Sequence, residues 1–187
     1  MSFTDDEQLG RLCEVLNAHH VVYVIFGSFA GRLQGAELHT VDVDIVPDRS
    51  VHNLQRLCDA LNSLSPRWRI DDVSEGLRID GGRLEPRHIL GSSIALGLVT
   101  SAGLVDIVLE PAGFERGYDD LSWHAITVDV AGNRVRIGAI EDLIRSKELL
   151  GREKDREHLP DLRARQAELN LERSKHRDPG DDLGLGL

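Results

Sequence analysis

The chain has 187 residues, of which 41% are hydrophobic and 29% are charged, values typical of one globular domain of ordinary size. This composition excludes a disordered or fibrous chain, and the longest apolar run, residues 21–26, is far shorter than the roughly 18 residues of a membrane span. The N-terminus has no basic residue before Arg11, so we expect no signal peptide. Two isolated cysteines, Cys13 and Cys58, predict a reduced, cytoplasmic protein without disulfides or a thiolate zinc site.

The net charge of −10 argues against a protein that coats nucleic acid with its whole surface. The charge is unevenly spread, because residues 145–177 hold ten Lys or Arg and seven Asp or Glu, a balance of +3. The other 154 residues carry −13. Aromatic residues make up only 4%, which disfavours a base-stacking platform. Any contact with nucleic acid is therefore expected to be local and mostly to phosphate.

The apolar periodicity predicts helices alternating with strands along most of the chain. The first helix begins at residue 4 or 5 and carries an apolar stripe at helical spacing: Leu9, Leu12, Cys13 and Leu16. The predicted strands cover residues 21–26, 41–46, 94–100, 104–109, 126–130 and 134–137, the last four forming two hairpins. The other predicted helices cover residues 29–34, 51–61, 141–150 and a segment from Gly151 to about residue 171.

These elements predict a mixed α/β fold, a mixed sheet of about five strands flanked by helices, with a C-terminal helical extension. We expect a core over residues 1–138, a helical segment over 139–177 that completes the functional site, and a flexible tail over 178–187. Two prolines and four glycines interrupt residues 63–91, so the pattern predicts neither the structure nor the role of that stretch.

A glycine and a serine, Gly27 and Ser28, stand between the apolar run 21–26 and a short predicted helix. The free backbone N–H groups and the dipole of a helix N-terminus favour an anion. Gly27 would let a phosphate approach the backbone, and the Ser28 hydroxyl would add a donor. Taken alone, Gly-Ser before a helix is a common turn.

Two aspartates, Asp42 and Asp44, lie in the next predicted strand at a spacing that puts both carboxylates on one face of the sheet. Like charges held side by side repel, so the pair favours a divalent cation, Mg²⁺ or Mn²⁺, between them. Asp106 is a third carboxylate, embedded in an apolar strand. Alternatively, the pair lies on a solvated strand face and Asp106 guards a sheet edge.

In their order along the chain, these parts fit metal-assisted phosphoryl transfer: an anion cradle, two carboxylates for a cation and a third acid that helps to deprotonate a hydroxyl. The set FGS at 26–28, DVD at 42–44 and VDIV at 105–108 resembles the minimal nucleotidyltransferase fold of the DNA polymerase β superfamily. That resemblance implies Mg²⁺-dependent transfer of a nucleoside monophosphate from an NTP to a hydroxyl, with release of pyrophosphate.

The segment IGAIEDLIRSKELLGREKDREHLPDL, residues 137–162, resembles the AbiEii/MenT-type nucleotidyltransferase toxins of type IV toxin–antitoxin systems. The resemblance implies that Lys147 and Asp155, with Arg152, complete the active site, Lys147 and Arg152 binding the nucleotide. It also implies the 3′ end of tRNA as acceptor, a pyrimidine NTP as donor, the role of a growth-arresting toxin and a cognate kinase-like antitoxin as partner.

The sequence pattern also points to Lys147 as a site residue independently of the resemblance, because Lys147 continues the apolar stripe of the predicted helix 141–150. A lysine on such a stripe either extends its amine to solvent or meets anions in a cleft, and the predicted triphosphate favours the cleft. Asp155 is either an exposed helix acid or, as the resemblance implies, a residue that orients Lys147 or the nucleophile. Six basic residues are candidates for acceptor phosphate contacts, or simply a solvated helix face: Arg145, Arg152, Lys154, Arg156, Arg163 and Arg165.

Thr40 precedes Asp42 by two positions and therefore shares its face of the strand. It is either an ordinary β-former at the start of a strand or a regulatory position, because a phosphate there would add negative charge beside the carboxylates. Two other functions stay open at this point: transfer to a small molecule or a protein, and a nucleotide-binding module that no longer turns over.

Overall fold

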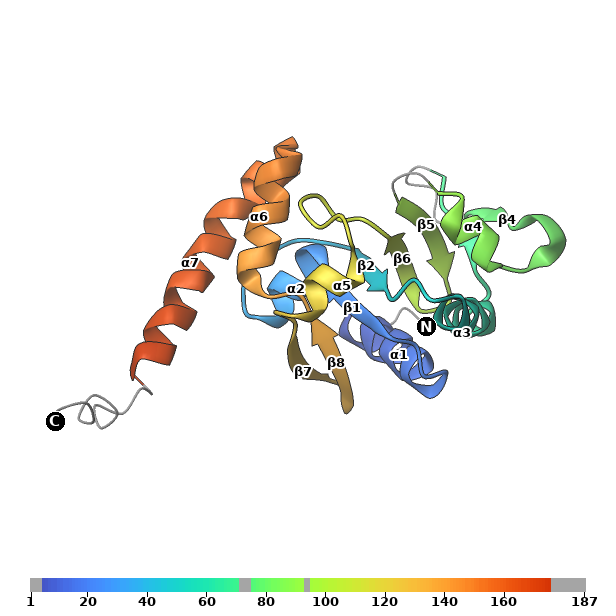
Figure 1. The fold of residues 1–187 in the computed structure, drawn as a ribbon, viewed down its shortest axis with the longest axis horizontal. Coiled ribbons are helices and arrows are strands. Elements are labelled where there is room, and N and C mark those ends of the chain that lie inside the picture. The colour runs from blue at the N-terminus through green and yellow to red at the C-terminus, as the bar shows by residue number, and fades with distance from the viewer. Residues whose placement is uncertain (1–4, 71–74, 93–94, 176–187) are drawn as a thin grey trace, which may run out of the picture.

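The computed structural model describes residues 5–70, 75–92 and 95–175 (Figure 1). One eight-stranded mixed sheet runs through this part of the chain, in the order β4-β3-β5-β6-β2-β1-β8-β7. Its strands are β1 Tyr23–Phe26, β2 Asp42–Pro47, β3 Arg67–Trp68, β4 Leu77–Arg78, β5 Ala95–Thr100, β6 Gly103–Val108, β7 Ile126–Val130 and β8 Asn133–Ile137. The helices are α1 Asp5–Ala18, α2 Gly27–Leu33, α3 Val51–Ser63, α4 Pro86–Leu90, α5 Tyr118–Ser122, α6 Ile140–Leu150 and α7 Glu153–Lys175, with a short 3-10 turn at Asp80–Gly82.

The hydrophobic core forms where α1 and α3 pack against each other and against the central strands. Val43 and Ile45 of β2 point into it, as do Val105 and Ile107 of β6, and all four side chains are buried. The alternation of β2 therefore turns Asp42 and Asp44 away from the core. One face of the central sheet is thus fixed by apolar burial, and the polar residues are left on the other.

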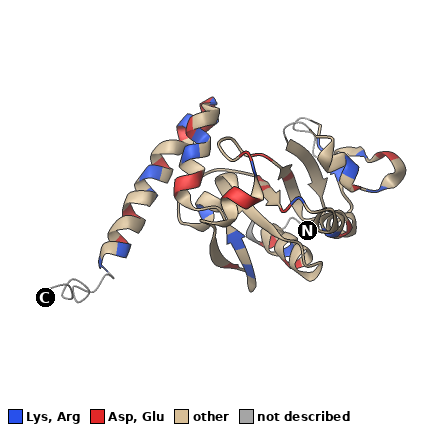
Figure 2. Ribbon diagram, viewed as in Figure 1, with Lys and Arg blue, Asp and Glu red and all other residues tan. Residues whose placement is uncertain are grey.

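The C-terminal helices begin against the core, to which Leu143 and Leu159 contribute, and α7 continues beyond it (Figure 1). Helix α6 packs on α2, and α7 packs on α6 before it extends away from the sheet (Figure 1). The two helices are joined at Gly151, whose φ of 60° is in the left-handed region that favours glycine at a helix end. Lysines, arginines and acids alternate along α7 (Figure 2), and the helix is polar around most of its circumference.

The structure confirms the mixed α/β fold with its C-terminal helices but corrects the number of strands, which is eight rather than about five. Residues 63–91, for which the sequence pattern predicted no structure, account for part of the difference. They form the two-residue strands β3 and β4 and the short helix α4. Helix α2 begins at Gly27 rather than residue 29, and α7 continues to Lys175. The predicted tail 178–187 lies outside the described residues.

No helix in the described part of the chain combines the length and the apolar character needed to cross a membrane.

Candidate active site

The Gly27-Ser28 step lies against the carboxylate of Asp44. Strand β1 is buried along its whole length and ends at Phe26, where the chain bends into α2. Gly27 has a φ of 66°, and a Cβ at this position would collide with the Asp44 carboxylate. A glycine is therefore required here for two reasons, the backbone conformation and the close approach of the acid. Ser28 follows with its side chain buried.

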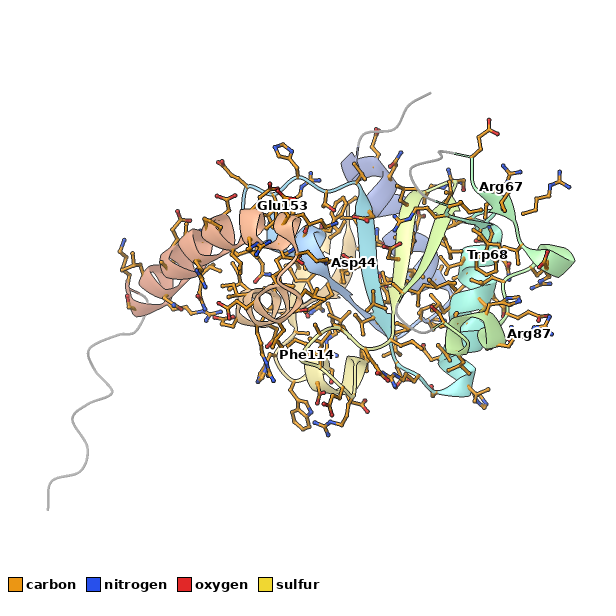
Figure 3. All side chains as sticks on the ribbon, turned by 90° about the horizontal axis from the view of Figure 1, so that it is seen from above. Asp44, Arg67, Trp68, Arg87, Phe114 and Glu153 are labelled. Carbon is orange, nitrogen blue, oxygen red and sulfur yellow. The ribbon has the colours of Figure 1, made fainter. Side chains whose placement is uncertain are left out.

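The parallel pairing of β2 and β6 brings the three acids together. Asp44 lies directly opposite Asp106 in the ladder, and Asp42 lies two positions earlier on the same face. Asp44 is near the middle of the molecule, between the C-terminal helices and the strands β5 and β6 (Figure 3). The structure thus gathers Asp42, Asp44 and Asp106 beside the Gly27-Ser28 step.

An arginine that sequence reasoning missed holds two of these carboxylates. Arg69, which follows β3, donates from Nη2 to Asp106 Oδ2 at 2.6 Å and from Nη1 to Asp42 Oδ2 at 3.3 Å. No periodic signal pointed to Arg69, because β3 has only two residues and lies within residues 63–91.

Burial and mutual repulsion disfavour the ionised form of the carboxylates in this cluster. Burial, and then the neighbouring charges of Asp42 and Asp106, raise the pKa of Asp44 to about 7. Burial also raises the pKa of Asp106, although the Arg69 guanidinium pulls it down. For Asp42, burial works in the upward direction, but the Thr40 hydroxyl, Lys154 and Arg69 outweigh it and lower the pKa.

Among the described residues, no group of three or more His, Cys, Asp or Glu side chains is placed to hold a metal ion as the structure stands. The guanidinium of Arg69 contacts two of the three acids instead. The donor set nonetheless fits a divalent cation such as Mg²⁺ or Mn²⁺. It offers carboxylate oxygens from three residues, and Asp106 Oδ1 is buried without a hydrogen-bond partner. A cation would relieve the repulsion that raises the pKa of Asp44.

The other wall of the site carries a basic cluster, which consists of Lys147 on α6 and of Arg152 and Lys154 at the start of α7. Lys147 is only 6% exposed, and its Nζ lies 3.2 Å from Ser28 Oγ and 3.2 Å from Asp155 Oδ1. Asp155 is fully buried in the first turn of α7 and accepts a 2.7 Å hydrogen bond from Arg152 Nε. The structure therefore brings Ser28, Lys147, Arg152 and Asp155 into one network.

The pKa values in this network follow from burial and pairing. Burial lowers the pKa of Lys147, while the Asp155 carboxylate opposes the shift. Burial would raise the pKa of Asp155, but the hydrogen bonds from Arg152 and the charge of Lys147 outweigh it and hold that pKa below its usual value. The interpretation of Asp155 as an exposed acid is therefore wrong, because the packing of α7 on α6 covers it.

His158 is a second residue that the sequence reasoning missed. Its Nδ1 lies 3.1 Å from Ser28 Oγ and 3.3 Å from Lys147 Nζ. A signal was available, since His158 follows Asp155 by three positions and so shares its face of α7.

The acids and the basic cluster line one cleft of about 190 Å³. Apolar side chains complete its wall: Phe26, Val108, Pro111, Ala112, Leu143 and Leu150. A larger and more open hollow of about 840 Å³ lies at the β3–β4 edge, away from the carboxylates.

The remaining predicted residues are Thr40 and the other basic candidates. Thr40 Oγ1 donates to Asp42 Oδ1 at 2.8 Å, so Thr40 lies beside the acid cluster. The remaining basic candidates are mostly engaged within the protein: Arg145 over the Phe114 ring, Arg163 with Glu148, and Arg165 with Glu168, Glu172 and the Gln34 carbonyl. Lys154 lines the cleft, whereas Arg156 is exposed on α7.

No protein-family model and no curated protein matches the chain. Among solved structures, the chain is similar to a Thermotoga maritima protein named as a nucleotidyltransferase, with 18% identity and a TM-score of 0.51, over 90% of this chain and 91% of that one. It is also similar to the antibiotic-resistance factor ANT(2″)-Ia, with 14% identity and a TM-score of 0.48, over 94% of this chain and 100% of that one. The chain therefore has the nucleotidyltransferase fold.

Proposed function

We propose that the protein is a divalent-cation-dependent nucleotidyltransferase, which moves a nucleoside monophosphate from an NTP to a hydroxyl group. The observation that carries this proposal is the arrangement of the cleft. Three carboxylates on β2 and β6 line the same cleft as a buried lysine and a Gly-Ser step at a helix N-terminus. Such a pairing of anionic and cationic walls suits a metal-bound triphosphate.

In this proposal Asp42, Asp44 and Asp106 hold Mg²⁺ or Mn²⁺. When bound, the cation supplies Lewis-acid stabilisation of the charge on the phosphoryl oxygens. The acceptor hydroxyl oxygen forms the new bond to the α-phosphorus, and the bond from that phosphorus to the bridging oxygen of pyrophosphate breaks. Asp106 takes up the hydroxyl proton, since its Oδ1 atom has no hydrogen-bond partner.

The basic wall would bind the leaving pyrophosphate. Gly27 and Ser28 offer a backbone N–H and a hydroxyl to the phosphates, and Lys147 neutralises the charge that builds as pyrophosphate departs. Asp155 and Arg152 fix the direction of the Lys147 amine. Lys154, exposed at the rim of the same cleft, adds a second positive charge. The apolar side chains of the cleft provide a surface for the sugar or base.

For the acceptor, we propose the 3′ end of tRNA and a role as the toxin of a toxin–antitoxin pair. The support is the resemblance of residues 137–162 to AbiEii/MenT-type toxins, together with the network that Lys147, Arg152 and Asp155 form. Thr40 is the proposed target of a kinase-like antitoxin. Its hydroxyl already donates to Asp42, so a phosphate there would bring two negative charges against the acid cluster.

The test is incubation of the full chain with each α-labelled NTP in turn, in Mg²⁺, with total tRNA, total protein or an aminoglycoside. We expect label on tRNA with one NTP in preference to the others. Asp42→Asn should abolish transfer without loss of the fold, whereas Asp161→Asn, which changes an exposed acid on α7, should leave it unchanged. Label on protein or on the aminoglycoside instead of tRNA would contradict tRNA as the acceptor and would identify the true class of acceptor. Binding of Mg²⁺–NTP without any product would contradict the enzyme proposal and would indicate a nucleotide-binding module.

A further inference from the structure

Arg69 is joined to the acid cluster by the architecture of the sheet itself. The pairing of β3 with β5 ends at Trp68 opposite Leu98, and the Arg69 backbone N–H continues it by donating to the Gly97 carbonyl at 3.0 Å. Gly97 lies opposite Asp106 in the next ladder, and Asp106 lies opposite Asp44. Arg69, Gly97, Asp106 and Asp44 thus form one row across the strands.

Gly97 leaves the space through which the arginine reaches the acids. A Cβ at Gly97 would lie 3.0 Å from Arg69 Nε and 3.3 Å from Asp106 Oδ1. Both distances are shorter than ordinary van der Waals contact, so a side chain here would push against the guanidinium and the carboxylate together. The absence of that side chain lets the arginine lie across β5 and end between Asp106 and Asp42.

The guanidinium holds oxygens that a cation would need. It donates to Asp106 Oδ2 and to Asp42 Oδ2, and the Arg69 side chain is only 23% exposed. The buried cation on the other wall, Lys147, is bonded to Ser28 and Asp155 instead of the acids. Arg69 is therefore the positive group that hydrogen-bonds the carboxylate cluster among the described residues.

We propose that Arg69 is a built-in counterion of the carboxylate cluster, which competes with a divalent cation for Asp42 Oδ2 and Asp106 Oδ2. The inference rests on the metal site of the proposed function. A cation that takes these two oxygens breaks their hydrogen bonds from Arg69 and is repelled by the guanidinium charge. Arg69 therefore offsets the charges of Asp42 and Asp106 in the metal-free protein and lowers the affinity of the site for metal without nucleotide.

The experiment measures the binding of Mn²⁺ alone to the full chain, by the electron paramagnetic resonance signal of free Mn²⁺, without nucleotide. Arg69→Gln should raise the affinity by about tenfold or more, since a full positive charge beside the site is removed. Arg69→Lys, which keeps the charge but loses the forked geometry, should fall between the two. The matched control is Arg67→Gln. Arg67 lies two residues earlier along the chain, donates to the Glu75 carbonyl and, within the described part of the chain, has no ion pair with Asp42, Asp44 or Asp106.

A structural readout accompanies the titration. In EDTA, Arg69→Gln should melt below wild type, because Asp42 and Asp106 lose their counterion, and saturating Mn²⁺ should raise its melting temperature by more than that of wild type. Circular dichroism establishes that each variant is folded before it is titrated.

The outcomes separate this inference from the proposed function. Equal Mn²⁺ affinity for wild type and Arg69→Gln, with binding abolished in both by Asp42→Asn, would overturn the counterion role and leave the metal site standing. Tighter binding by Arg69→Gln that survives Asp42→Asn would place the cation elsewhere and overturn both. Absence of Mn²⁺ binding in folded wild type and folded Arg69→Gln would also overturn both.

Discussion

Replacing Asp155 by asparagine removes the negative charge from the network that holds Lys147. Asp155 is fully buried and receives hydrogen bonds from Lys147 Nζ at 3.2 Å and from Arg152 Nε at 2.7 Å. Asparagine has nearly the same shape, so the change leaves the packing of α7 on α6 intact while the Lys147 ammonium loses its direct ion pair. Breaking a buried ion pair in this way typically costs about 3–5 kcal/mol of unfolding free energy.

For a chain of this length each kcal/mol shifts the melting temperature by about 2–4 °C, so we expect Asp155→Asn to melt about 6–20 °C below wild type in a thermal scan at pH 7. If the enzyme proposal holds, nucleotidyl transfer should also fall by about 100-fold, because Lys147 loses the group that directs it at the phosphates. The control is Asp161→Asn, an exposed acid on the same helix, which should stay within about 0.5 kcal/mol of wild type.

The pH dependence gives a second check on the same pair. Because the folded-state pKa of Asp155 is lowered, the ionised carboxylate stabilises the fold above the unfolded pKa of about 4, and this contribution is lost as the pH falls through the lower folded value. The difference in melting temperature between wild type and Asp155→Asn should therefore shrink on acidification below about pH 4. If Asp155→Asn instead melts within 2 °C of wild type at pH 7, where about 6 °C is the least expected, the reasoning about this pair is refuted.

Three further changes probe the rest of the site. Asp44→Asn should stabilise the metal-free protein more at pH 8 than at pH 5. The folded pKa of Asp44 is raised to about 7, so its destabilising effect builds up as the pH rises from the unfolded value of about 4 to about 7, and equal shifts in melting temperature at both pH values would contradict the repulsion. Gly27→Ala should abolish transfer and lower the melting temperature, because its Cβ meets the Asp44 carboxylate, and an active variant of wild-type stability would contradict the contact. Thr40→Glu should abolish transfer while Thr40→Val keeps most of it, and a fully active Thr40→Glu would remove the regulatory proposal.

The sequence predicted the acid cluster because its signal is local. Asp42 and Asp44 alternate with apolar residues in a strand long enough to show its period, and Asp106 is flanked by Val105 and Ile107 in another. Their meeting depends only on β2 and β6 being neighbours in the sheet. Lys147 was predictable for the same reason, since it continues the apolar stripe of a regular helix.

The features that the residues alone did not show are those whose surroundings come from distant segments. Nothing in the local sequence buries Asp155, which is covered only when α7 folds back on α6. Arg69 follows a two-residue strand and lies 37 positions before Asp106 along the chain, and its path to the acids depends on Gly97 in another strand. Such contacts leave no periodic trace in the segments that make them.

The central claim is that three carboxylates hold a cation beside a phosphate cradle, and a crystal structure of the full chain with Mn²⁺ and a non-hydrolysable NTP analogue tests it most directly. We predict an anomalous Mn²⁺ peak between Asp42, Asp44 and Asp106, with the triphosphate against Gly27, Ser28 and Lys147. A peak remote from these carboxylates, or a triphosphate bound outside this cleft, would contradict the account.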